Sequence, residues 1–233
     1  MFSAKIRKSA LAVVMACLAM STPAALAERA DRGGSTVRLL DSGRSALSAC
    51  ARPDAKTLQA ILPIATDHGS QATGVVYDEN RVLTAAHAVT GGGQFFVKVG
   101  GSYRIADLVV VDETRDLAVL AVDTQTIRPL HIAGFDPVEY QPVWAVGYPR
   151  AQAMMTSVGV LQDYHEGALH SSASIDSGQS GGGLLSCNDG AWEMLGMLRG
   201  FGAYLDGDHY VKIKNHSVSV AASSIHQFLR NSY

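Results

Sequence analysis

The stretch DSGQSGGGLLSC, Asp176–Cys187, places four glycines close to Ser180, which lies between Gln179 and Gly181. Glycine at this density weakens regular strands and helices, so the segment needs a backbone with few steric limits. Two interpretations compete: a nucleophile held in a backbone cradle, or a flexible turn. Only the rest of the chain can decide between them, because a serine nucleophile needs chemical partners.

Residues 1–27 have the pattern of a secretory signal peptide. Three basic residues precede an apolar run from Ala10 to Met20, and Ala25–Ala27 forms a small-residue cleavage signature. The apolar run is too short to span a bilayer, which makes a retained anchor the weaker alternative. We therefore expect an exported protein, periplasmic or secreted, that has no membrane contact once residues 1–27 are removed.

The remaining chain has about 206 residues, enough for one large domain or two half-domains. It carries about 16 basic and 21 acidic residues, a net charge of about −5. This mild acidity argues against a nucleic-acid partner, since phosphate binding needs a basic surface. No second apolar run is long enough for a membrane helix, and the oligomeric state stays open.

Two cysteines remain after cleavage, Cys50 and Cys187. In an exported protein such a pair is a disulfide candidate, because the compartment is oxidising. The alternative is two separately buried thiols, since sequence does not show whether the two Cα atoms lie within bonding range.

The composition and the hydrophobic pattern of the chain change near Leu58. Residues 28–57 are polar and lack periodicity, and we interpret them as an N-terminal segment that is partly disordered or a pro-region. Residues 58–233 alternate short apolar runs with turn residues, which is typical of an all-β sandwich or barrel. Only SVAASSIHQFLRN, near the C-terminus, has apolar residues at helical spacing.

Three motifs supply the parts of a nucleophile–base–orienter relay. VLTAAHAV carries His87, TRDLAVLAV carries Asp116, and SGQSGGG carries Ser180. A serine hydroxyl needs a base to become nucleophilic, and histidine titrates near neutrality. A buried carboxylate would orient the imidazole, and the N–H groups of Gly178 and Ser180 are the expected donors of an oxyanion hole. Each motif alone is weak, because such residues are common in turns and loops.

The order His, Asp, Ser in LTAAH, DLAVL and GxSGG resembles the trypsin-like, chymotrypsin-fold serine proteases. The short gaps of 29 and 64 residues, and VGYP at Val146–Pro149, are similar to the compact bacterial branch, which includes the glutamyl endopeptidases and the HtrA protease domain. The resemblance implies two packed antiparallel six-stranded β-barrels, about 58–135 and 136–233, with a C-terminal helix. It also implies no metal and no organic cofactor.

The chain departs from the family pattern in ways that matter. HtrA proteases usually append PDZ domains, and we expect none after the predicted helix here. Gln179 replaces the aspartate that pairs with a freed N-terminus in zymogen-activated relatives, and a neutral amide cannot form that ion pair. Gly178–Gly182 also satisfies G-x-S-x-G, the nucleophile elbow of α/β-hydrolases. That alternative needs a helix after the serine, where this chain has a glycine-rich turn and an apolar run.

The resemblance also implies where a substrate side chain would bind. Ser174 stands where trypsin-specific enzymes carry aspartate, which argues against cleavage after Arg or Lys. His209 could face an acidic substrate residue, although the glutamyl endopeptidases place their histidine where this chain has Leu198. We expect a small or apolar residue before the scissile bond, with Glu or Asp as the alternative. The residues expected to line this pocket are Ser174, Ile175, Leu198, Arg199, Gly200 and His209.

The sequence thus predicts an exported serine endopeptidase that acts on proteins or peptides through an acyl-enzyme. The remaining histidines show no zinc-type spacing. The competing hypothesis is a catalytically inactive homologue that binds peptides by β-strand addition.

Overall fold

The computed structural model describes residues 50–134 and 137–232. The predicted signal peptide, residues 1–27, and residues 28–49 of the predicted N-terminal segment lie outside the described residues.

The first half of the described chain forms a closed six-stranded antiparallel barrel with the strand order β1-β2-β3-β6-β5-β4. Short runs of Val, Ile and Leu bounded by glycine or aspartate form its strands, as expected for β-propensity punctuated by turn residues. Its strands are β1 (Ile61–Thr66), β2 (Gln71–Asp78), β3 (Arg81–Thr84), β4 (Phe95–Val99), β5 (Ser102–Asp112) and β6 (Leu117–Ala121).

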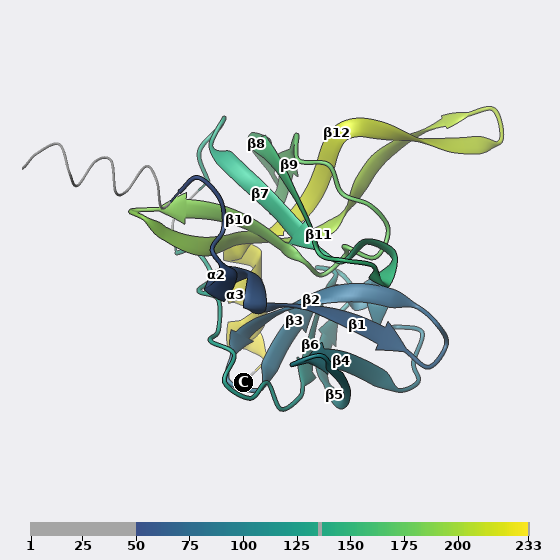
Figure 1. The fold of residues 1–233 in the computed structure, drawn as a ribbon. Helices are drawn as coiled ribbons and strands as arrows, with labels where there is room; N and C mark the ends of the chain where they lie inside the picture. The colour runs from purple at the N-terminus through teal and green to yellow at the C-terminus, as the bar shows by residue number, and fades with distance from the viewer. Residues whose placement is uncertain (1–49, 135–136, 233) are drawn as a thin grey trace, which may run out of the picture. The chain divides into compact units, whose positions relative to one another are not determined.

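The second half forms another closed antiparallel barrel of six strands, in the order β10-β11-β12-β9-β8-β7. Its strands are β7 (Pro142–Gly147), β8 (Met155–His165), β9 (Ala168–Ser171), β10 (Gly183–Asn188), β11 (Ala191–Asp206) and β12 (His209–Ala221). In Figure 1 the first barrel carries the blue and dark teal colours and the second the green and yellow ones. The predicted pair of six-stranded antiparallel barrels is therefore confirmed.

The hydrophobic core fills the interior of the barrels. In β6, Leu117, Ala118, Val119 and Leu120 are all buried, because this strand is covered on both faces. In the second barrel the rings of Trp144 and Trp192 meet edge to face with centroids 4.8 Å apart. Burial of apolar surface at this scale is the main force that holds a β-barrel closed.

A short helix, α2 (Ala55–Gln59), precedes β1 and was not predicted. The side chain of Asp54 caps it by accepting a 2.8 Å hydrogen bond from the N–H of Thr57. Before α2, Cys50 forms a disulfide with Cys187 at the end of β10, with the two Cα atoms 5.6 Å apart. The predicted pairing is thus present, and it attaches the start of the described chain to the second barrel.

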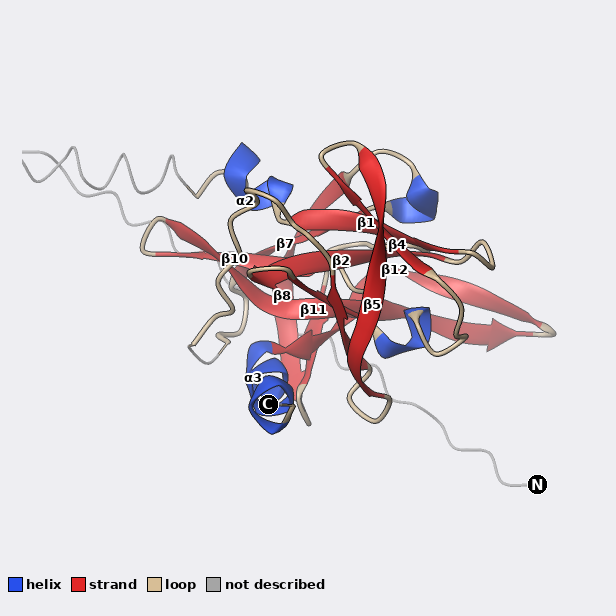
Figure 2. Cartoon of the chain, turned by 90° about the horizontal axis from the view of Figure 1, so that it is seen from below, coloured by secondary structure: helices blue, strands red, loops and turns tan. Residues whose placement is uncertain are grey.

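Two features extend beyond the barrels. The predicted C-terminal helix, α3 (Ala222–Asn231), buries Ala222, Ile225 and Phe228 on one face, at the spacing expected for an amphipathic helix. The hairpin of β11 and β12 projects outward as a long twisted ribbon, visible at the upper right of Figure 1 and again in Figure 2, where strands are red. Two short 3-10 turns, η1 (Ala86–Ala88) and η2 (Pro149–Ala151), complete the described part of the fold.

Candidate active site

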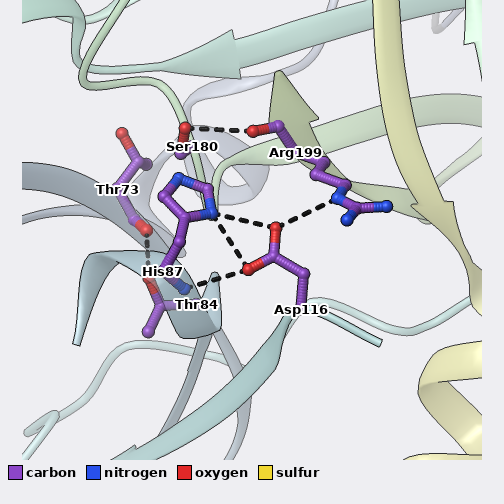
Figure 3. A network of polar contacts seen from close by, with 6 residues as sticks. All are labelled: Thr73, Thr84, His87, Asp116, Ser180 and Arg199. Carbon is purple, nitrogen blue, oxygen red and sulfur yellow. Dashed lines mark hydrogen bonds and ion pairs between the residues drawn. The ribbon is translucent and has the colours of Figure 1, made fainter. Parts of the chain in front are cut away.

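His87 and Asp116, which are 29 residues apart, meet in the first barrel. His87 lies in η1 directly after β3, and Asp116 ends the turn before β6. His87 Nδ1 is 2.9 Å from both carboxylate oxygens of Asp116, and the backbone N–H of His87 donates to Asp116 Oδ1 at 2.9 Å. Three contacts from one residue hold the imidazole in a single orientation. Figure 3 shows the second ring nitrogen on the side of Ser180.

Ser180 belongs to the turn before β10 and lines the same pocket as His87. Its hydroxyl donates to the backbone carbonyl of Arg199 at 3.1 Å. Within the described residues no hydrogen bond joins Ser180 to His87. Hydrogen bonds between catalytic groups are often long or absent before substrate binds, so this geometry is compatible with a relay.

The Asp116 side chain is only 6% exposed and has cations or donors on two sides. Burial raises the pKa of this carboxyl, but hydrogen bonds from the ring and backbone of His87, with the charges of His87 and Arg199, outweigh burial and lower it. Arg199 contributes through its Nε, which lies 3.3 Å from Asp116 Oδ2. Asp116 is therefore held as the carboxylate that an orienting role requires.

The loop before Ser180 leaves two backbone donors without acceptors. The N–H groups of Gln179 and Gly181 are taken by the carbonyls of Asp176 and Leu198. Among the described residues, no acceptor is bound by the N–H of Gly178 or of Ser180. These are the two groups that the sequence predicts for an oxyanion hole, and both remain free to donate to an incoming atom.

Gly178 has φ of +94°, in the left-handed region that favours glycine. A Cβ at this position would lie 2.6 Å from the backbone nitrogen of Arg150 and 2.8 Å from the carbonyl oxygen of Tyr148. Both the conformation and the crowding therefore require glycine here. This is the physical reason for at least one of the glycines in the stretch.

Gln179 supports the loop through its side-chain amide. Its side chain is buried, and Oε1 accepts a 2.8 Å hydrogen bond from the N–H of Asp176. Because the backbone N–H of Gln179 donates back to the carbonyl of Asp176, the two residues close a small ring. A neutral amide thus holds this part of the loop.

Thr73 on β2 is a second support for the loop, and the sequence analysis did not identify it. Its hydroxyl donates to the carbonyl of Gly178 at 2.8 Å and accepts from the N–H of Tyr148 at 2.9 Å. Its N–H donates to the carbonyl of Ser180 at 2.9 Å, and its own carbonyl accepts from Thr84 Oγ1 at 2.7 Å. A lone threonine in a strand carries no local signal of this role, since its partners are far away in sequence.

The residues predicted for substrate binding are only partly brought together. Ile175 and Gly200 line the pocket of about 350 Å³ that contains His87 and Ser180. Leu198 is fully buried and does not line it. The hydroxyl of Ser174 donates to Asn215 Oδ1 at 3.1 Å and does not line this pocket.

Two predicted pocket residues lie elsewhere. His209 pairs with Asp206 at the tip of the β11–β12 hairpin and is exposed, because these two strands continue well past the barrel. It does not line the pocket that contains His87 and Ser180. The side chain of Arg199 turns toward Asp116, because the buried carboxylate attracts it, and lines the neighbouring pocket on the other side of His87.

The structure adds one residue near the Ser180 pocket that the sequence did not indicate, Lys212. Phe201, at the base of the hairpin, and Asp176 line the pocket with Ser180. Lys212 Nζ lies 2.5 Å from Asp176 Oδ1 and 4.9 Å from the centre of the Phe201 ring. Lys212 is on β12, so only the pairing of β11 with β12 brings it near the loop.

Residues 50–134 and 137–232 contain no group of three or more His, Cys, Asp or Glu side chains placed to hold a metal ion. No helix in this part of the chain has the length and apolar character needed to cross a membrane.

The model of a known family, described as the trypsin-like peptidase domain, matches residues 72–197. This range is more than half of the chain and contains His87, Asp116 and Ser180. The chain belongs to the trypsin-like peptidase family. It is accordingly a serine endopeptidase, and its substrates are proteins or peptides.

Solved protease structures share the fold of this peptidase. The Rv3671c protease in its inactive form is 23% identical, with 76% of this chain and 90% of that chain covered and a TM-score of 0.64. The active form of the M. tuberculosis Rv3671c protease is 20% identical, with 88% and 93% covered and a TM-score of 0.65. The serine endoprotease from Yersinia pestis is 20% identical, with 81% and 65% covered and a TM-score of 0.65. No curated protein matches the peptidase.

Proposed function

We propose that this peptidase hydrolyses peptide bonds with Ser180 as nucleophile, His87 as general base and Asp116 as the residue that orients His87. The observation that carries the proposal is the 2.9 Å contact of His87 Nδ1 with both oxygens of Asp116, which leaves the other ring nitrogen on the side of Ser180. A base oriented in this way can accept the proton of a serine hydroxyl and later return it to a leaving amine.

The reaction begins when the Ser180 hydroxyl rotates away from the carbonyl of Arg199 and donates to His87 Nε2. Ser180 Oγ then bonds to the scissile carbonyl carbon while its proton passes to His87. The oxyanion accepts hydrogen bonds from the N–H groups of Gly178 and Ser180, each worth about 3 kcal/mol in the transition state. The C–N bond breaks as His87 protonates the amine. Water then bonds to the acyl carbon while His87 takes its proton, and the acid leaves as the bond to Ser180 Oγ breaks and His87 returns the proton to that oxygen.

We propose a small or apolar residue before the scissile bond. The walls of the pocket include Ile175, Gly200 and Phe201, and Asp176 is neutralised by Lys212 at 2.5 Å. Digestion of a mixed peptide library, followed by sequencing of the cleavage sites, tests this preference. Predominant cleavage after Glu or Asp would contradict it.

We also propose that residues 1–27 direct export and that residues 28–57 act as a pro-segment of the domain at 58–233. The disulfide between Cys50 and Cys187 supports an oxidising compartment, where such bonds persist. Because of this bond, a cut at any point in 51–57 would leave the N-terminal piece attached. Sequencing the mature N-terminus, with and without reduction, tests this proposal.

A catalytically inactive peptide-binding homologue is the second candidate function. The hydrogen bond from Ser180 to the carbonyl of Arg199, in place of one to His87, is the observation that favours it. The two functions differ in the reactivity of the serine, since an inactive homologue would bind peptides without forming an acyl-enzyme.

A fluorophosphonate probe distinguishes the two. The full chain should be labelled at Ser180, and Ser180→Ala should remove labelling while Ser102→Ala, at an exposed serine of β5, leaves it unchanged. Folded wild-type protein that binds peptides but resists the probe would favour the binding module. Equal labelling of Ser180→Ala would exclude Ser180 as the nucleophile.

A further inference from the structure

Arg199 on β11 contacts two of the three proposed relay residues. Its side-chain Nε lies 3.3 Å from Asp116 Oδ2, and its backbone carbonyl accepts the hydroxyl of Ser180 at 3.1 Å. Figure 3 shows the guanidinium on the opposite side of the Asp116 carboxylate from His87. The carboxylate is therefore shared between an imidazole and a permanent cation.

We propose that Arg199 is a positioning residue that shares the Asp116 carboxylate with His87 and thereby sets the acidic limit of the peptidase's working pH range. The proposal rests on the proposed function of Ser180, His87 and Asp116. The Arg199 side chain contacts the orienting carboxylate of Asp116, so its charge acts on His87 from the opposite side of that carboxylate.

The effect of Arg199 on His87 is electrostatic. When His87 is protonated, the imidazolium and the guanidinium lie on either side of one carboxylate, and their mutual repulsion disfavours the protonated ring. Arginine stays charged throughout the accessible pH range, so this repulsion is always present. The Arg199 charge therefore opposes protonation of His87, whereas the Asp116 carboxylate favours it.

The surrounding charges leave this effect in place. Glu113 is the other ionisable group in the pocket that Arg199, His87 and Asp116 line. On the far side of Arg199, Arg115 is paired with Asp112 at 2.6 Å, and in the Ser180 pocket the carboxylate of Asp176 is paired with Lys212. The charges of these paired groups should be nearly the same in wild type and in the Arg199 variants.

The test is the pH dependence of fluorophosphonate labelling of Ser180 in the full chain. Arg199→Gln and Arg199→Met both remove the charge, and each should move the acid limb of the labelling rate upward by about 0.5 to 1 pH unit. Arg199→Lys keeps a cation and should stay close to wild type. Arg128→Gln, at an exposed arginine outside the described pockets, should not move the limb. The difference between the acid limbs of wild type and the two uncharged variants should shrink in 1 M salt. Arg199 is half exposed, and salt at this concentration screens its charge.

A second readout does not depend on catalysis. In a Ser180→Ala background, the ring signals of His87, assigned by their loss in His87→Gln, should titrate about 0.5 to 1 pH unit higher when Arg199 is also changed to Gln. If Arg199 had only a structural role, replacing it would slow labelling at every pH. The midpoints of the labelling curve and of the His87 titration would then stay unchanged.

The outcomes separate this inference from the proposed function. If wild-type Ser180 is not labelled at any pH, the proposed relay is wrong. If wild type is labelled but the midpoints of wild type, Arg199→Gln and Arg199→Met coincide in labelling and in the His87 titration, Arg199 does not tune the base and the inference is overturned. A downward shift would also overturn it, because the sign of the charge effect is then reversed.

Discussion

The hydroxyl of Thr73, in the first barrel, donates a 2.8 Å hydrogen bond to the carbonyl of Gly178, in the loop of the second barrel that precedes Ser180. The same hydroxyl accepts from the N–H of Tyr148 at 2.9 Å. One fully buried threonine thus joins the two barrels at the point where the oxyanion donors are expected.

Thr73→Val preserves the shape of the side chain but removes both hydrogen bonds. Two buried backbone groups are then left unpaired, and the free energy of unfolding should fall by about 2 to 4 kcal/mol, with slower labelling of Ser180. Chemical denaturation measures the first effect and probe kinetics the second. Thr126→Val, at an exposed threonine, should change stability by less than about 0.5 kcal/mol. Equal stabilities of the two variants would show that the Thr73 contacts are dispensable.

Gly181 and Gly190 form a matched pair, because their φ angles are +85° and +81°. A Cβ at Gly181 would clash with the carbonyl oxygen of Thr73 and with Thr84 Oγ1, whereas a Cβ at Gly190 meets nothing within 4 Å. Gly190→Ala should lower the free energy of unfolding by about 1 to 2 kcal/mol, because alanine disfavours this backbone conformation. Gly181→Ala should cost at least about 2 kcal/mol more, or prevent folding, in the same denaturation experiment. If the two alanine substitutions lower the free energy of unfolding equally, a Cβ at Gly181 is not crowded.

Asp116→Asn keeps the size of the side chain and removes its charge. If Asp116 orients His87 as proposed, kcat should fall by about 10⁴, because an amide favours the wrong imidazole tautomer. Asp107→Asn, at an exposed aspartate of β5, is the control and should retain kcat. A loss below about tenfold in Asp116→Asn would remove Asp116 from the relay.

The lowered pKa of Asp116 also predicts acid sensitivity. The folded-state pKa lies below the unfolded value of about 3.9, so the carboxylate contributes stability above that pH. That contribution is lost as the pH falls through the folded-state pKa. The free energy of unfolding should therefore drop more steeply between about pH 5 and 2 in wild type than in Asp116→Asn. Parallel curves would mean that Asp116 is not stabilised as an anion in the folded state.

The disulfide between Cys50 and Cys187 closes a sequence separation of 137 residues. A double change of both cysteines to serine should lower the free energy of unfolding by about 2 to 4 kcal/mol. Reduction of the wild-type protein should lower it by a similar amount, and the double variant should not respond to reductant. A wild-type protein whose stability is unchanged by reduction would contradict this prediction.

Much of the fold could be predicted from local patterns. Short apolar runs separated by turn residues indicate β-strands, because strand propensity and turn chemistry are properties of a few neighbouring residues. The motifs around His87, Asp116 and Ser180 are also local, and each carries the residue type that its proposed role requires. The amphipathic spacing of Ile225 and Phe228 predicted α3 for the same reason.

The direction of individual side chains could not be predicted in this way. His209 was expected near the substrate, but β11 and β12 continue past the barrel and carry it to the tip of their hairpin. Arg199 was expected in the substrate pocket, but the buried Asp116 carboxylate draws its flexible side chain away. Both outcomes depend on strand length and on charges contributed by distant segments.

The amino-acid sequence by itself determined the class of fold and the chemical groups available for catalysis, because both follow from residue types and short-range spacing. Only the tertiary structure decided what holds those groups in place. The loop before Ser180 is supported by the amide of Gln179 and by Thr73, and the latter lies 105 residues from its partner Gly178. Such contacts arise from closing two barrels against each other, and no local stretch of sequence carries that information.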